Sequence, residues 1–82
     1  MMGGVEYRES DVRYIKAIAT HPDPVVTAPE IAEAIDVSQQ AAYDRLSNLE
    51  SRGLVKSKQV GARARIWWLT TTGREVYAEI IS

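Results

Sequence analysis

Six of the ten Lys and Arg residues of this 82-residue chain lie between residues 37 and 68. That segment has a net charge of +4, whereas residues 1–36 have −4 and residues 69–82 have −1. The formal net charge of −1 therefore conceals one basic segment between two acidic ones. Clustered cationic side chains attract phosphate groups, provided that the elements carrying them form one surface.

Two elements are predicted within the basic segment. Ser38 is expected to cap a helix from Gln39 to about Arg52, whose apolar residues recur at spacings of four and three: Ala42, Leu46 and Leu49. Gly53 ends that helix, and the runs 54–60 and 63–69 are predicted to pair as a hairpin through Gly61-Ala62. This hairpin carries four basic residues: Lys56, Lys58, Arg63 and Arg65.

Three further helices and a short strand complete the prediction. Ser10 is expected to cap a first helix that ends at residues 21–24, where two prolines disfavour helix, and residues 25–26 are predicted as a minimal strand. Residues 27–30 form a capping box for a short second helix, and Thr70 or Thr71 caps the last one. The expected fold is α+β, mainly α, in the order α-β-α-α-β-β-α, with residues 1–9 flexible and residues 10–82 forming one domain.

The two central helices and the hairpin resemble a known family. A helix-turn-helix needs a small residue where its helices approach and an apolar residue after the turn, and Ala32 and Val37 meet these needs. From residue 27 to residue 73 the chain is similar to the winged helix-turn-helix of MarR-like prokaryotic regulators. The similarity rests on four runs: Pro29-Glu30-Ile31-Ala32, Val37-Ser38-Gln39-Gln40, the stretch from Leu46 to Val55, and Leu-Thr-x-x-Gly at 69–73.

This resemblance implies three helices, a small antiparallel β-wing and a C-terminal helix. It also implies sequence-specific binding of double-stranded DNA by a small transcription regulator, with recognition helix 39–52 in the major groove and wing 54–69 on the backbone or minor groove. The absence of cysteine in so short a chain favours a cytoplasmic location. Glutamine can bond bidentately to adenine, and a carboxylate can accept from a cytosine amine. The predicted DNA-binding residues are Ser38, Gln39, Gln40, Tyr43, Asp44, Arg45, Ser47, Asn48, Lys56, Lys58, Arg63 and Arg65. For Asp44, solvent exposure or pairing with a nearby arginine is the alternative.

Other classes of function find little support. The chain has no cysteine and one histidine, and no nucleophile–base pair, metal-ligand cluster or phosphate loop is visible, so no enzyme, metal or cofactor is expected. No apolar run approaches the ~18–20 residues of a membrane helix. A winged-helix module that binds protein without DNA remains the alternative function, favoured if Ile66 and Trp68 are exposed and not covered by the last helix or the N-terminus. A homodimer is expected through the first helix and an apolar set on the last: Val76, Tyr77, Ile80 and Ile81.

Overall fold

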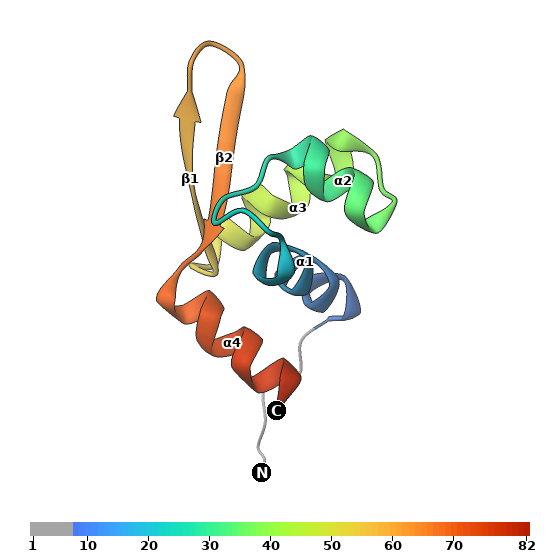
Figure 1. The fold of residues 1–82 in the computed structure, drawn as a ribbon, viewed down its shortest axis with the longest axis vertical. Helices are drawn as coiled ribbons and strands as arrows, with labels where there is room; N and C mark the ends of the chain where they lie inside the picture. The colour runs from blue at the N-terminus through green and yellow to red at the C-terminus, as the bar shows by residue number, and fades with distance from the viewer. Residues whose placement is uncertain (1–7) are drawn as a thin grey trace.

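Four helices and one antiparallel hairpin make up the chain in the computed structural model, which describes residues 8–82 (Figure 1). The helices are α1 (Glu9–Thr20), α2 (Ala28–Ile35), α3 (Gln39–Ser51) and α4 (Thr71–Ile81). The strands are β1 (Val55–Val60) and β2 (Ala64–Leu69). The hairpin projects past the helices at one end of the molecule, and α4 lies at the other end (Figure 1). This arrangement is the predicted winged helix, mainly α. No helix in residues 8–82 is long and apolar enough to cross a membrane.

Local hydrogen bonds set the turn between α2 and α3. The capping box is confirmed, since the Thr27 hydroxyl accepts from the Glu30 amide at 3.3 Å while the Thr27 amide donates to the Glu30 carboxylate at 2.8 Å. Asp36 ends α2 in the left-handed conformation with φ 58°, which aspartate tolerates better than most residues. The Ser38 hydroxyl then accepts from the Ala41 amide at 3.0 Å and starts α3, as predicted.

One hydrophobic core joins all these elements. Its largest fully buried side chains come from α1, α2, α3, both strands and the loop before α2: Trp67, Ile15, Ile31, Leu46, Leu49, Val26 and Val55. Strand alternation holds in β2, because Trp67 and Leu69 are buried while Ile66 and Trp68 lie on the opposite face and are half-buried. Trp68 is thus neither fully covered nor fully exposed.

The predicted strand at residues 25–26 is wrong. Only Val26 pairs, in a single bridge with Trp67 whose two backbone hydrogen bonds measure 2.8 and 2.9 Å. Pro24 on one side has no N–H to extend the ladder, and on the other side Thr27 already caps α2. The observed order is therefore α-α-α-β-β-α.

Two predictions at the chain ends also need correction. The first helix begins at Glu9, with Arg8 as its N-cap and no side-chain capping bond, so Ser10 does not cap it. Arg8 and Glu9 thus belong to the start of α1, and the rest of the predicted flexible segment lies outside the described residues. In α4, Val76 is buried in the core of its own domain, so it cannot contribute to a dimer surface.

Candidate nucleic-acid interface

The outward side of α3 carries polar side chains and no cation. Ala42, Leu46 and Leu49 have no exposed surface, so the opposite side of the helix faces solvent. Gln40 and Asp44 are exposed there, one turn apart, and Ser47 is half-buried. Gln39 is also exposed, in the first turn of α3.

A groove of about 420 Å³ separates the first turns of α3 from the wing. Five of the predicted DNA-binding residues line it: Gln39, Gln40, Tyr43, Arg63 and Arg65. The first turn of α2 forms another wall through Ala28 and Pro29. The positive ends of two helix dipoles and two guanidinium groups therefore border one groove, which suits an anion.

Apolar contacts hold the α3 side of this groove in place. The ring of Tyr43 packs edge-on against Trp67, with centroids 5.7 Å apart and planes at 85°. Trp67 is 1% exposed and belongs to the core, whereas Tyr43 is 43% exposed. Tyr43 thus presents a partly exposed aromatic ring to the groove, and the contact with Trp67 restrains that ring.

The two wing arginines differ in their surroundings. Arg63 is exposed at the turn of the hairpin. Arg65 is half-buried and donates to the Ser57 hydroxyl at 2.8 Å, and that hydroxyl donates to the Glu50 carboxylate of α3 at 2.9 Å. The hydrogen bonds from Arg65 to Ser57 and from Ser57 to Glu50 tie the wing to α3, and nothing in the sequence pattern indicated them.

Lys56 and Lys58 lie on the outer face of the hairpin. Their cross-strand partners are Trp68 and Ile66, on the face opposite that of the buried Trp67. The structure therefore separates these two lysines from the groove. Both lysines are exposed, whereas Ile66 and Trp68 are half-buried.

Arg45 and Asn48 are engaged with other side chains in a cluster around Asp11 of α1. The carboxylate of Asp11, 1% exposed, accepts two hydrogen bonds from Arg52 at 2.9 and 3.2 Å. Arg45 lies 3.8 Å from the same carboxylate, and Asn48 accepts from Arg52 at 2.9 Å. These residues form a cluster that fastens α3 to α1, here called the Asp11 cluster.

The sequence contained a signal for the Asp11 cluster. Asp11 precedes Ile15 by four residues and Ile18 by seven, so it occupies a position of the apolar stripe of α1. An acidic residue on a buried stripe needs a cationic partner. Nearby, burial raises the pKa of the Tyr14 phenol above its ordinary value of 10.0, and the positive charges of Arg45 and Arg13 oppose that rise.

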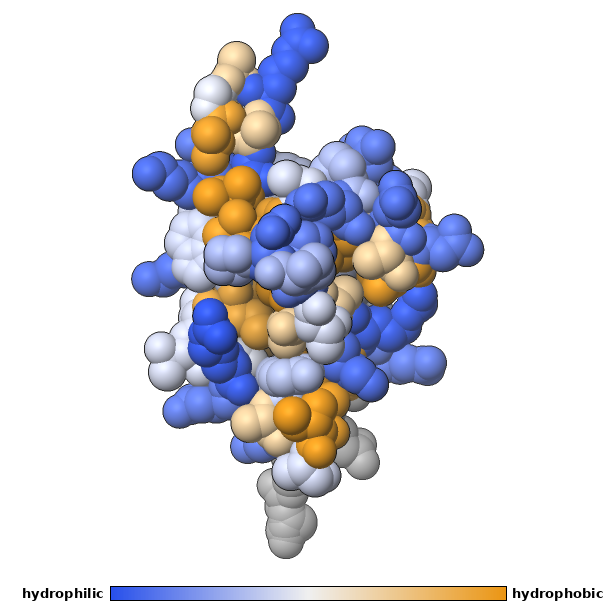
Figure 2. Space-filling model, viewed as in Figure 1, coloured by the Kyte–Doolittle hydropathy of each residue, from blue (hydrophilic) through white to orange (hydrophobic). Residues whose placement is uncertain are grey.

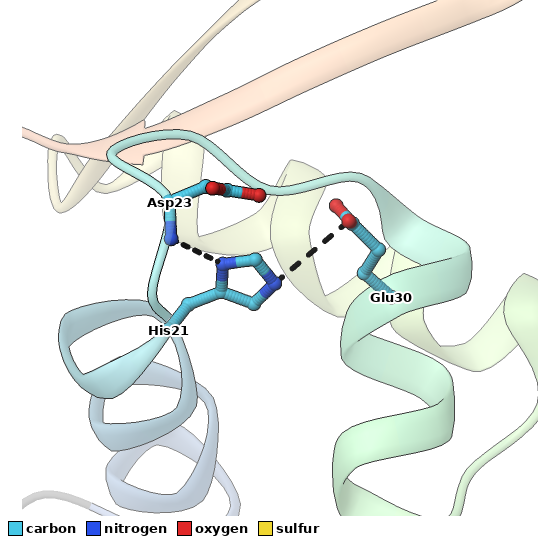
Figure 3. A group of neighbouring side chains, drawn as sticks. All are labelled: His21, Asp23 and Glu30. Atoms are coloured by element: carbon cyan, nitrogen blue, oxygen red, sulfur yellow. Dashed lines mark hydrogen bonds and ion pairs between the residues drawn. The ribbon is translucent and has the colours of Figure 1, made fainter.

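Within residues 8–82, His21, Asp23 and Glu30 form a group of side chains that could hold a metal ion, with ligand atoms within 4.8 Å of one another (Figure 3). The backbone amide of Asp23 donates to Nδ1 of His21 at 3.0 Å, so a neutral ring carries its proton on Nε2. That nitrogen faces the Glu30 carboxylate at 3.8 Å. A metal on Nε2 would require the proton on Nδ1, opposite an amide N–H. The geometry therefore suits a His–Glu contact and does not fit a metal site.

The chain belongs to a helix-turn-helix family. The family model described as a helix-turn-helix domain matches residues 12–58, which cover α2, α3 and most of α1 and β1. No curated protein sequence matches significantly.

Solved structures of transcription regulators share the fold. Staphylococcus aureus MepR, a regulator of the multidrug efflux pump MepA, has a TM-score of 0.82 at 20% identity over 93% of this chain and 56% of its own. A mutant of E. coli MarR, complexed with operator DNA, has a TM-score of 0.81 at 20% identity over 90% and 53%. Zinc-responsive ZitR of Lactococcus lactis has a TM-score of 0.77 at 23% identity over 98% and 55%. The chain spans about half the length of these proteins and has the winged-helix fold of MarR regulators, as the resemblance implied.

Proposed function

We propose that this chain binds double-stranded DNA sequence-specifically, as a cytoplasmic transcription regulator and without enzymatic activity. Recognition helix α3 enters the major groove, and the wing follows the backbone toward the minor groove. One observation carries the proposal: Gln39, Gln40 and Tyr43 of the first turns of α3 line the same groove as the wing residues Arg63 and Arg65. The operator DNA bound by the MarR mutant and the oligodeoxyribonucleotide bound by a mutant of MepR support it.

In this proposal, one set of residues positions the protein on the DNA backbone and another set reads the base sequence. Arg63 neutralises a phosphate, and Arg65 does so while holding the wing to α3. Ser38 and the first-turn amides of α3 face the backbone, because helix N-termini favour phosphate. Gln39, Gln40 and Tyr43 contact base edges, with Asp44 and Ser47 further along the same helix. Lys56 and Lys58 add long-range attraction from the outer face of the wing.

The test measures affinity for labelled mixed-sequence duplex DNA by fluorescence anisotropy over a series of salt concentrations. The slope of log affinity against log salt, which is negative, should become less steep by about 0.9 in Arg63→Ala, because one phosphate contact is lost. Arg74→Ala is the matched control, since Arg74 is an exposed arginine on α4 and its removal causes the same loss of charge. Equal slopes in the wild type and both variants would remove the wing from the interface.

A homodimer would let two copies read two half-sites about one helical turn apart. Its proposed surface combines α1 with the apolar end of α4, where Figure 2 shows hydrophobic side chains at the surface. Ile81 is 59% exposed, and Tyr77 and Ile80 are half-buried beside it. Sedimentation velocity at micromolar protein tests this, and the dimer predicts twice the monomer mass.

The alternative is a module that binds another protein and not DNA. The outer face of the wing favours it, because Val60 there is 47% exposed and Ile66 and Trp68 are half-buried. A folded protein without salt-dependent affinity for duplex DNA would support this alternative and contradict DNA binding.

A further inference from the structure

The carboxylate of Asp44 lies at the middle of the side of α3 that would face DNA. It is exposed, and its helical position is opposite the buried stripe of Ala42, Leu46 and Leu49. A negative charge there opposes binding to phosphates. A carboxylate on a surface that would bind a polyanion needs a specific partner to offset its charge.

No cation in the described part of the chain is that partner. Within residues 8–82, no Lys, Arg or His side chain comes within ion-pair distance of Asp44. Its neighbour Arg45 points instead to the buried Asp11, 3.8 Å away, and Arg52 bonds to the same Asp11. The Asp11 cluster thus leaves the carboxylate of Asp44 uncompensated.

Gln40 is the partner of Asp44 in the structure. Its Nε2 donates a hydrogen bond of 2.9 Å to Oδ1 of Asp44, one turn along the helix. This bond orients the amide of Gln40 and uses one of its two N–H groups. The pair still presents the carbonyl oxygen of Gln40, the second oxygen of Asp44 and a single N–H, so acceptors dominate it.

Acceptors on a protein match donors on a base edge. In the major groove the donors are the exocyclic amines of adenine and cytosine, whereas guanine and thymine present acceptors at the corresponding position. We propose that the Gln40–Asp44 pair reads such an amine, selecting adenine or cytosine on the contacted strand and rejecting guanine and thymine. This inference rests on the proposed function and names the base chemistry that the site recognises.

The experiment first selects bound duplexes from a random pool with the wild-type protein. Affinities are then measured for the four bases at each position of the selected site. One position should prefer adenine and cytosine over guanine and thymine. In Asp44→Asn the new amide supplies a donor, so this preference should fall by roughly fivefold to a hundredfold, the range that one good base contact supplies. Gln40→Ala should weaken the preference at the same position.

Glu75→Gln is the matched control, because Glu75 is an exposed acid on α4 and the change removes the same charge. This variant should bind slightly more tightly overall and keep the wild-type base preferences. If wild-type protein binds a defined site and Asp44→Asn keeps every base preference, the inference is wrong and DNA binding stands. If wild-type protein binds no duplex DNA, the proposed function is wrong and the inference is wrong with it.

Discussion

Asp11→Ala is expected to destabilise the fold strongly, because Asp11 of α1 holds Arg45 and Arg52 in and directly after α3. The substitution removes a carboxylate that is 1% exposed, accepts two hydrogen bonds from Arg52 and lies 3.8 Å from Arg45. Breaking a buried ion pair by deleting one partner costs about 3–5 kcal/mol. The side chains of Arg52 and Arg45 are 39% and 32% exposed, so water solvates them after the change and lowers that cost. We expect a loss of about 2–3 kcal/mol of unfolding free energy.

Thermal unfolding followed by circular dichroism measures the effect. In a domain of this size each kcal/mol shifts Tm by about 4–8 °C, so Tm should fall by about 10–20 °C. Glu33→Ala is the control, because Glu33 is an exposed acid on α2 and its removal should change the unfolding free energy by less than about 0.5 kcal/mol.

A double-mutant cycle identifies the partner of Asp11. In Asp11→Ala combined with Arg52→Ala, the loss should be smaller than the two single losses together, because residues in one ionic network are coupled. Strict additivity, or a Tm for Asp11→Ala close to that of the control, would show that the Asp11 cluster contributes little to stability.

Three other predictions concern pH, packing and association. Burial raises the pKa of the Tyr14 phenol above 10.0, so Tyr14 stabilises the fold fully below about pH 10, and this stabilisation is lost as the pH rises through the folded-state pKa. In urea titrations, the difference in unfolding free energy between wild type and Tyr14→Phe should therefore become smaller above about pH 10. A difference that stays constant with pH would contradict this. Gly73→Ala should cost about 1–3 kcal/mol in thermal unfolding, since its Cβ would overlap the carbonyl oxygen of Leu54, whereas exposed Thr72→Ala should be near neutral. Ile81→Asp should convert a dimer to monomer in sedimentation velocity while leaving the circular dichroism spectrum unchanged, because Ile81 is 59% exposed; a variant that stays dimeric would exclude the end of α4 from the interface.

Features set by neighbouring residues could be predicted from the sequence. The capping box of Thr27 and Glu30, the Ser38 cap and the apolar stripe of α3 all depend on bonds or periods within one or two helical turns. The wing followed from two β-like runs around Gly61, which adopts φ 67° in the turn. The exposure of Gln40 opposite the buried stripe follows for the same reason, since three buried positions determine the orientation of the whole helix.

The direction of each charged side chain was decided by tertiary structure. Arg45 and Asp44 are neighbours in the sequence, yet one points to α1 and the other to solvent, because a buried carboxylate 34 residues before Arg45 attracts it. Likewise, the segment before α2 pairs with β2 only at Val26, through a bridge to Trp67, which lies 41 residues further along the chain. The sequence by itself determined the elements and their polar and apolar faces, since these depend on short-range bonding. Only the packed structure decided which cations remain available to a ligand, since that depends on pairing across the core.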